Sequence, residues 1–81
     1  SLNPMPKGIL NWKFADVEKF LKKYKFILNY VNGSHYYYIG HYDKIFRQVC
    51  VPFHGSASIK PRTMNGIILQ SGIPKAVWLK K

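Results

Sequence analysis

The chain has 81 residues, a length at the low end of the single-domain range, which excludes a second independent core. Hydrophobic residues make up 47% and aromatic residues 16% of the sequence, which is too apolar for a disordered basic tail. Thirteen Lys and Arg residues against three acids give a formal charge of +10, so we expect a polyanionic partner, with nucleic acid ahead of an anionic membrane.

Two further features concern the surroundings of the protein. No apolar run approaches the roughly 20 residues of a membrane-spanning helix, and no signal-peptide core stands near the N-terminus. Cys50 is the one cysteine, which excludes an internal disulfide and suits a reducing compartment. We therefore expect a soluble, cytoplasmic protein without a membrane partner.

The first third of the chain is predicted to hold an arm and a helix. Residues 1–12 form the arm, because prolines and a glycine interrupt any sustained period there. Residues 13–81 are predicted to form a single domain. It opens with a helix over 13–25, in which apolar residues recur along one side at helical spacing. Those residues are Phe14, Val17, Phe20, Leu21 and Tyr24, and the opposite side carries Lys19, Lys22 and Lys23.

Three β-prone segments follow, separated by turn signals. The first covers 26–31 and leads into Asn32-Gly33, a pair typical of a type I′ hairpin turn, which needs positive φ at both positions. The second covers 34–40, and a turn over 40–44 separates it from the third, which covers 45–53. These segments predict an antiparallel meander.

The pairing of the second and third segments decides where the histidines lie. Pairing about the predicted turn places His35 opposite Cys50, so His35, His54 and Lys60 share one rim of the sheet. Four residues of strand span roughly 13 Å, however. Direct contact between His35 and His54 is therefore not expected unless the loop after Phe53 folds back.

The last third is predicted to be helical. After a loop over 55–59, Pro61 marks the first position of a helix that stops at Gly72, and Pro74 opens a short final turn. The order is helix, three strands, helix. The predicted fold class is therefore α+β, an α-β-β-β-α chain with a three-stranded antiparallel sheet and two helices on one face.

Catalysis in this chain would have to run without a metal or another cofactor. No metal-binding or nucleotide-binding motif is present, and three acids cannot supply a carboxylate-bridged two-metal nuclease centre. The side chains that exchange a proton near neutral pH are His35, His41 and His54. RNA permits a reaction that needs only such groups: a base takes the 2′-hydroxyl proton, the oxyanion attacks the adjacent phosphorus, and an acid protonates the departing 5′-oxygen.

Three motifs stand in order within this small basic domain: Gly33-Ser34-His35, Val51-Pro52-Phe53-His54-Gly55 and Lys60-Pro61-Arg62-Thr63. With the helices around them, they resemble the HicA-type (YcfA-like) mRNA interferase toxins over about residues 13–79. The resemblance implies a double-stranded-RNA-binding-domain-like fold, endoribonuclease activity carried by the histidine matching His35, and inhibition by a HicB-type antitoxin. The chain departs from the family at Lys25, where glycine is usual at the helix stop, and at Arg62, Asn65 and Gly66 around the second helix.

We therefore predict a metal-independent endoribonuclease toxin that acts on mRNA, with His35 as general acid/base and His54 as a second candidate. Lys60, Arg62 and the first-helix residues Lys19, Lys22 and Lys23 are expected to hold phosphate, and Ser34 to contact RNA. One alternative is a non-catalytic RNA-binding module, with His35 a strand-edge residue and His54 tied to loop carbonyls. A DNA-binding or basic structural protein is disfavoured, because no helix exposes base-reading Asn, Gln or Arg in its first turn.

Aromatic residues are expected to divide between core and partner. Alternation sends Tyr36 and Tyr38 to one face of the sheet and Tyr37 to the other, so at least one set is core and the rest can stack on bases. Trp12 and Trp78 are expected to cover the ends of the core or to anchor the antitoxin. That antitoxin should be acidic where it touches and should bury His35.

Overall fold

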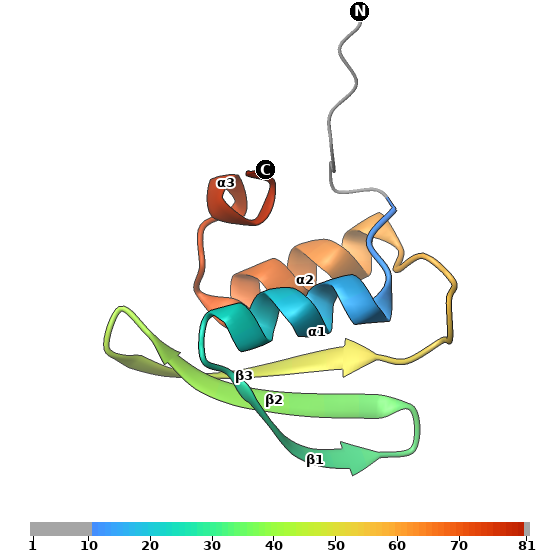
Figure 1. Cartoon of the computed structure of the whole chain (residues 1–81), viewed down its shortest axis with the longest axis horizontal. Helices are drawn as coiled ribbons and strands as arrows, with labels where there is room; N and C mark the ends of the chain where they lie inside the picture. Colours follow the sequence, from blue (N-terminus) through green and yellow to red (C-terminus); the bar gives the residue numbers. More distant parts are fainter. Residues whose placement is uncertain (1–10, 81) are drawn as a thin grey trace, which may run out of the picture.

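The computed structural model describes residues 11–80, so the arm predicted over residues 1–12 lies mostly outside the described residues (Figure 1). The elements are α1 (Phe14–Lys23), β1 (Ile27–Asn32), β2 (His35–Tyr42), β3 (Ile45–Pro52), α2 (Pro61–Ser71) and the short α3 (Lys75–Trp78). The predicted order of helix, three strands and helix is confirmed, and so is the short final turn after Pro74.

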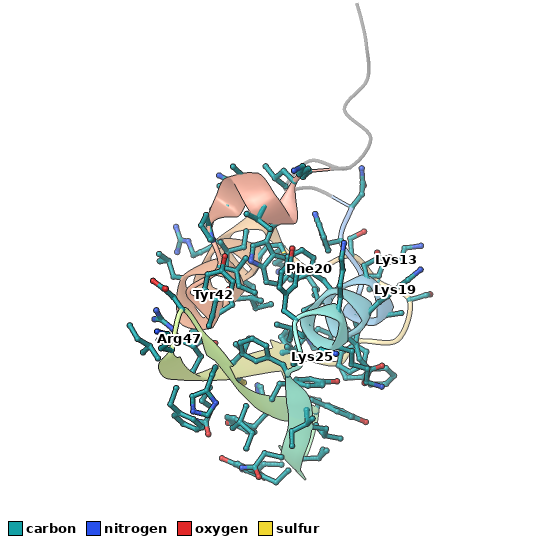
Figure 2. The ribbon with its side chains drawn as sticks, turned by 60° about the vertical axis from the view of Figure 1, so that its left-hand side comes forward. Lys13, Lys19, Phe20, Lys25, Tyr42 and Arg47 are labelled. Carbon is teal, nitrogen blue, oxygen red and sulfur yellow. The ribbon has the colours of Figure 1, made fainter. Side chains whose placement is uncertain are left out.

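α1 buries the side on which its apolar residues recur. Along that side lie the buried Phe14, Val17 and Leu21, with Phe20 and Tyr24 packed against them. At the start of the helix, the Asp16 carboxylate accepts a hydrogen bond of 2.9 Å from the Lys13 N–H, which satisfies an amide that the helix leaves unpaired. Figure 2 shows Lys13 and Lys19 on the exposed side of this helix.

α1 ends in a Schellman motif whose left-handed residue is Lys25. The Phe26 N–H donates to the Leu21 carbonyl and the Lys25 N–H to the Lys22 carbonyl, both at 3.0 Å. Lys25 has a φ of 70°. Glycine occupies that region without steric cost, whereas a residue with a Cβ occupies it at a cost of roughly 1 kcal/mol. A lysine thus stands where the backbone favours glycine.

Both hairpins have two-residue turns, and neither turn lies where the sequence predicts it. The β1–β2 pairing leaves Gly33-Ser34 as the turn, so the predicted Asn32-Gly33 turn is wrong by one residue. Of this pair only Gly33 has positive φ, at 62°, whereas a type I′ turn needs it at both positions. Asp43-Lys44 meets that requirement, with φ of 56° and 66°, and forms the β2–β3 turn.

The late β2–β3 turn shifts the register by two residues from the predicted one. Residues 40–42, predicted to be turn, stay in β2 because Asp43-Lys44 takes the left-handed positions. His35 therefore faces Pro52, and the predicted pairing of His35 with Cys50 is wrong. His54 follows the partner of His35 by only two residues, roughly 7 Å of extended chain instead of 13 Å.

A buried hydroxyl joins the last two helices. Ser71 Oγ donates to the Ile68 carbonyl at 2.7 Å and accepts hydrogen bonds from the Ile73 N–H at 3.0 Å and the Trp78 Nε1–H at 3.2 Å. Gly72 follows with a φ of 74° and ends α2. The three hydrogen bonds fix α3 against the end of α2.

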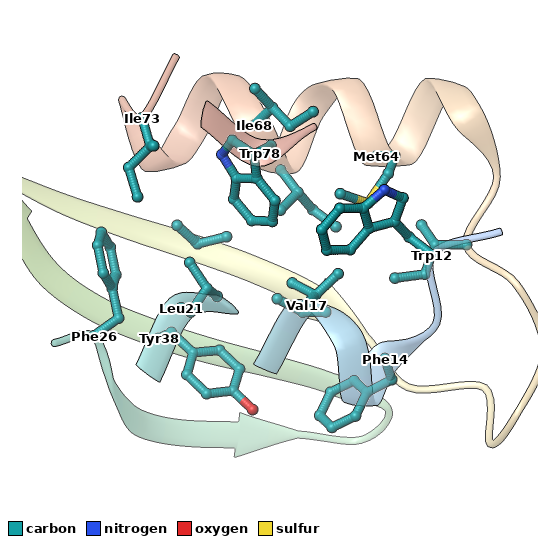
Figure 3. Packing of buried hydrophobic residues seen from close by; sticks show 14 residues of the cluster. Trp12, Phe14, Val17, Leu21, Phe26, Tyr38, Met64, Ile68, Ile73 and Trp78 are labelled. Atoms are coloured by element: carbon teal, nitrogen blue, oxygen red, sulfur yellow. The ribbon is translucent and has the colours of Figure 1, made fainter. Parts of the chain in front are cut away.

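The core fills the space between the sheet and the helices (Figure 3). Trp12 and Trp78 are both buried, at 5% and 2% exposure, with ring centroids 5.5 Å apart, and Phe20 stacks on Trp78 at 3.8 Å. The expectation that the two tryptophans cover the core is confirmed. The alternative, that they anchor an antitoxin from the surface, is wrong because the three rings bury one another.

The tyrosine run alternates as predicted. Tyr38 is fully buried, and its hydroxyl donates to Glu18 Oε2 at 2.6 Å, while Tyr36 packs against the core. Tyr37 points to the other face, where it stacks on Tyr30 with ring centroids 4.4 Å apart. β2 therefore has a core face and a face turned away from the helices.

The helices all lie on one face of the sheet, whose strand order is β1-β2-β3 (Figure 1). Both pairings are antiparallel. The α+β class and the layering of a double-stranded-RNA-binding-domain-like fold are thus confirmed. Among residues 11–80, no helix is long and apolar enough to cross a membrane.

Candidate active site

His35 and His54 line one groove, between the end of β3 and one side of α2. His35 is the first residue of β2, Pro52 faces it from the end of β3, and His54 follows in the loop. The groove has a volume of about 390 Å³. Its lining residues are His35, Cys50, Pro52, His54, Thr63, Gly66, Ile67 and Gln70. The corrected register is what brings the two histidines to the same place.

A single stripe of α2 forms the far wall of the groove. Thr63, Gly66, Ile67 and Gln70 follow one another at i, i+3, i+4 and i+7, so they share one side of the helix. Gln70 Oε1 accepts a hydrogen bond of 2.9 Å from the Cys50 N–H and so holds the helix to the strand. At Gly66, an added Cβ would meet no atom within 4 Å, so the glycine leaves this wall open.

A second hollow of about 510 Å³ adjoins the groove and shares Pro52, His54 and Thr63 with it. Lys60, the N-cap residue of α2, also lines this hollow. The first turn of α2 contains no acidic residue and its N-cap makes no side-chain hydrogen bond. Free amides and the positive end of the helix dipole favour an anion at such a terminus.

Arg62 and Ser34, which were also predicted to bind RNA, are both exposed. Arg62 is exposed in the first turn of α2, close in sequence to Lys60. Ser34 is exposed in the β1–β2 turn, and its carbonyl accepts a hydrogen bond of 2.7 Å from the Phe53 N–H. That bond ties the turn before His35 to the segment that carries His54.

The α1 lysines are exposed as predicted, but they do not line the groove. Lys22 Nζ lies 3.7 Å from Glu18 Oε2, and Lys23 Nζ lies 5.9 Å from the centre of the Tyr24 ring. Lys13, which was not predicted as a site residue, forms a β-bridge with Ser58, and Ser58 lines the hollow that also contains His54. The cations thus extend from the groove along α1.

Six lining residues were missed from the sequence as site residues, and three of them have a polar group or a thiol in the side chain: Cys50, Thr63 and Gln70. Thr63 and Gln70 carried a usable signal, because both fall on the α2 stripe that contains the buried Ile67. Cys50 carried none, because its place on the groove depends on the strand register.

Carboxylates are engaged elsewhere in the fold. Asp16 caps α1, Glu18 accepts the Tyr38 hydroxyl, and Asp43 sits in the β2–β3 turn at the end of β2 opposite to His35. Burial, and then the hydrogen bond to Glu18, raise the pKa of the Tyr38 phenol far above its ordinary value of 10.0. The described residues include no group of three His, Cys, Asp or Glu side chains placed to hold a metal ion.

Near the groove, a hydrogen bond with the Cys50 thiol raises the pKa of the Tyr37 phenol. Tyr37 and Cys50 face each other across β2 and β3. A phenol is uncharged at neutral pH even at its ordinary pKa of 10.0, so Tyr37 adds no negative charge to this part of the sheet.

The sequence model of one protein family, described as HicA toxin of bacterial toxin-antitoxin, matches residues 14–73. The chain belongs to this family. The match runs from the first residue of α1 to just past the end of α2, so it contains both histidines and every residue that lines their groove. As a HicA-family protein, the chain is the toxin of a toxin-antitoxin system and has an antitoxin as its partner. Neither a comparison with curated proteins nor one with solved structures finds a match.

Proposed function

We propose that this HicA-family toxin is an endoribonuclease that cleaves mRNA without a metal ion, with His35 as its general acid/base. The observation that carries the proposal is the groove itself. It brings two histidines together next to the cationic, uncapped start of α2, and no carboxylate lines it. Proton exchange near neutral pH and anion binding are what such a site offers.

The reaction is an attack by the substrate on itself. His35 accepts the proton of a 2′-hydroxyl, the 2′-oxygen bonds to the adjacent phosphorus, and the bond from phosphorus to the 5′-oxygen breaks. The departing 5′-oxygen takes a proton from an imidazolium, for which His54 in the same groove is the second candidate. The products are a 2′,3′-cyclic phosphate and a 5′-hydroxyl.

Phosphate binding falls to the residues at the start of α2. Lys60 lines the hollow that also contains His54, and Arg62 is exposed two residues later, in the first turn of α2. Ser34 flanks His35 on the other side. The exposed lysines of α1, Lys19, Lys22 and Lys23, extend the cationic surface for a longer RNA strand.

Neutralisation by the antitoxin is part of the proposal. A HicB-type antitoxin that is acidic where it touches would associate quickly with a chain of charge +10. If it covers His35, it excludes RNA from the groove. Association should slow as salt is added, because screening weakens the attraction.

The test compares two oligonucleotides of one sequence in EDTA, one of them all RNA and the other with a single 2′-deoxy residue at the cleavage position. The toxin should cleave the first, leave a 2′,3′-cyclic phosphate, and spare the second, because the nucleophile is the 2′-hydroxyl. Cleavage that needs a divalent metal, or that proceeds at the 2′-deoxy position, would refute the mechanism. Binding of RNA without cleavage would favour the non-catalytic RNA-binding module.

A further inference from the structure

The sheet face turned away from the helices is apolar and uncovered by any described element (Figure 1). Ile27 is 62% exposed, Phe46 57% and Tyr30 46%. Arg47 is the one Lys, Arg, Asp or Glu residue in the three strands, and its guanidinium lies against Gly72 on the helix side. On the outer face the three strands therefore present large exposed apolar groups and no Lys, Arg, Asp or Glu side chain, which is typical of the centre of a protein interface.

A hollow of about 280 Å³ lies in this face. Ile27, Ile39 and Phe46 give it apolar walls, and the His41 ring meets the Phe46 ring edge-on at 5.6 Å between centroids. Lys25 also lines it and supplies a cation. The hollow thus fits an apolar side chain that has a carboxylate beside it.

Lys25 adds a second, independent observation. It is a lysine at a φ of 70°, in the Schellman position where glycine is the unstrained choice. A strained residue that the fold itself does not need suggests a role in function. Because Lys25 lines the apolar hollow, its ammonium group is placed to pair with a carboxylate of a partner bound there.

The charges decide between the occupants of this face. A second copy of the chain would bring another charge of +10 against Lys25 and Lys44, so self-association is opposed. RNA needs several cations for its phosphates. The hollow of this face offers Lys25, whereas Lys19, Lys22 and Lys23 lie on α1 and Lys60 and Arg62 lie at the start of α2. A partner protein with apolar anchors fits the apolar centre of this face, and acidic residues around those anchors fit Lys25 at the hollow.

We infer that the antitoxin docks on this outer sheet face, with an apolar side chain in the hollow and a carboxylate against Lys25. This inference rests on the partnership with an antitoxin in the proposed function. His35 lies on the same face as Tyr37, Ile39 and His41, because alternate residues of a strand share a face. A partner that spreads from the hollow along β2 reaches His35 after roughly 20 Å. A partner that extends this far along β2 covers His35 and so closes that side of the groove.

The test uses the full toxin chain and the antitoxin encoded beside it, purified separately, with affinity measured by calorimetry. Ile27→Ser and Phe46→Ser should each weaken binding by about tenfold or more, as expected for anchors in a desolvated centre. Leu69→Ser is the matched control, since Leu69 is 78% exposed on α2 and lies off this face. Its affinity should stay within about twofold of the wild type.

Lys25→Gly separates docking from folding. It should raise the melting temperature by about 4 °C because it removes left-handed strain, and yet weaken antitoxin binding by about threefold at low salt. A loss of affinity in a stabilised protein cannot come from unfolding. Lys25→Gly with unchanged affinity and unchanged salt dependence would remove Lys25 from the interface.

RNA cleavage by the Ile27 and Phe46 variants should stay within about twofold of the wild type, because neither residue lines the histidine groove. Three results would overturn the inference: antitoxin affinity that both variants leave unchanged, RNA cleavage that they abolish, or a toxin dimer that they dissociate. If the wild-type toxin cleaves no RNA at all, the nuclease proposal fails, while the antitoxin affinities still decide where the partner docks.

Discussion

Tyr38 connects the sheet to α1 through one hydroxyl. Its ring is fully buried, and the hydroxyl donates to Glu18. The phenol ionises near pH 10.0 when free, whereas burial and that hydrogen bond keep its proton in place to higher pH in the folded chain. The folded state then binds more protons than the unfolded state above about pH 10, so this group lowers the free energy of unfolding as pH rises further.

Tyr38→Phe should show both parts of this contribution. Near neutral pH the variant should lose about 1 kcal/mol of unfolding free energy, the usual value of one hydrogen bond. Between about pH 10 and pH 11, its unfolding free energy should fall less steeply with pH than that of the wild type. Chemical denaturation at each pH measures both quantities, and parallel pH profiles would contradict the assignment.

Gly66 in α2 and Gly72, which directly follows this helix, should respond to alanine in opposite directions. Gly66 is inside the helix with open space where a Cβ would go, so Gly66→Ala should raise the unfolding free energy by about 0.5–1 kcal/mol. Gly72 has a φ of 74°, and a Cβ there would also run into the Arg47 guanidinium, so Gly72→Ala should lower it by about 1 kcal/mol. Thermal unfolding followed by circular dichroism compares the two, and shifts of the same sign would contradict this account of α2.

The elements differ in how far the sequence predicts them. α1 and α2 were predictable because their buried residues recur at helical spacing and proline and glycine mark the boundaries of α2. The β1–β2 turn was predicted one residue too early, because only Gly33 and not Asn32 has positive φ. The β2–β3 turn was missed because Asp43-Lys44 adopts left-handed φ without the glycine that is usual in such turns. One displaced turn moved the strand register by two residues.

The candidate site shares that dependence on register. His35 stood out from its motif, and the α2 stripe that contains Thr63 and Gln70 follows from periodicity. The meeting of His35 with His54 did not follow, because it requires His35 to face Pro52. Strand pairing depends on contacts across the sheet, which local sequence patterns describe poorly.

Across the whole molecule, charge and apolar surface are separated. Exposed lysines cover the outer side of α1, cations flank the start of α2, and the outer sheet face carries apolar side chains. An RNA strand held by these cations releases counterions, so the logarithm of its affinity should fall linearly with the logarithm of salt concentration, by roughly 0.7 for each phosphate contact.

The double variant Lys19→Ala, Lys23→Ala should make that salt dependence shallower. Each lost contact should lower the slope by about 0.7 and weaken binding of all sequences alike. A non-cleavable 2′-O-methyl RNA titrated at several salt concentrations measures the slope. Lys75→Ala, on the separate helix α3, is the control that should leave it unchanged. An unchanged slope in the double variant would take α1 out of the RNA-binding surface.

The rate of RNA cleavage by His35→Ala, measured in EDTA beside His41→Ala, tests the central claim most directly. Both histidines are exposed on β2 and belong to the same face of the sheet, but His35 lines the groove and His41 does not. His35→Ala should stay folded and keep its affinity for RNA while cleavage falls by about 10² or more, the scale of general acid–base catalysis. His41→Ala should cleave at close to the wild-type rate. Undiminished cleavage by His35→Ala would contradict the assignment of catalysis to this histidine.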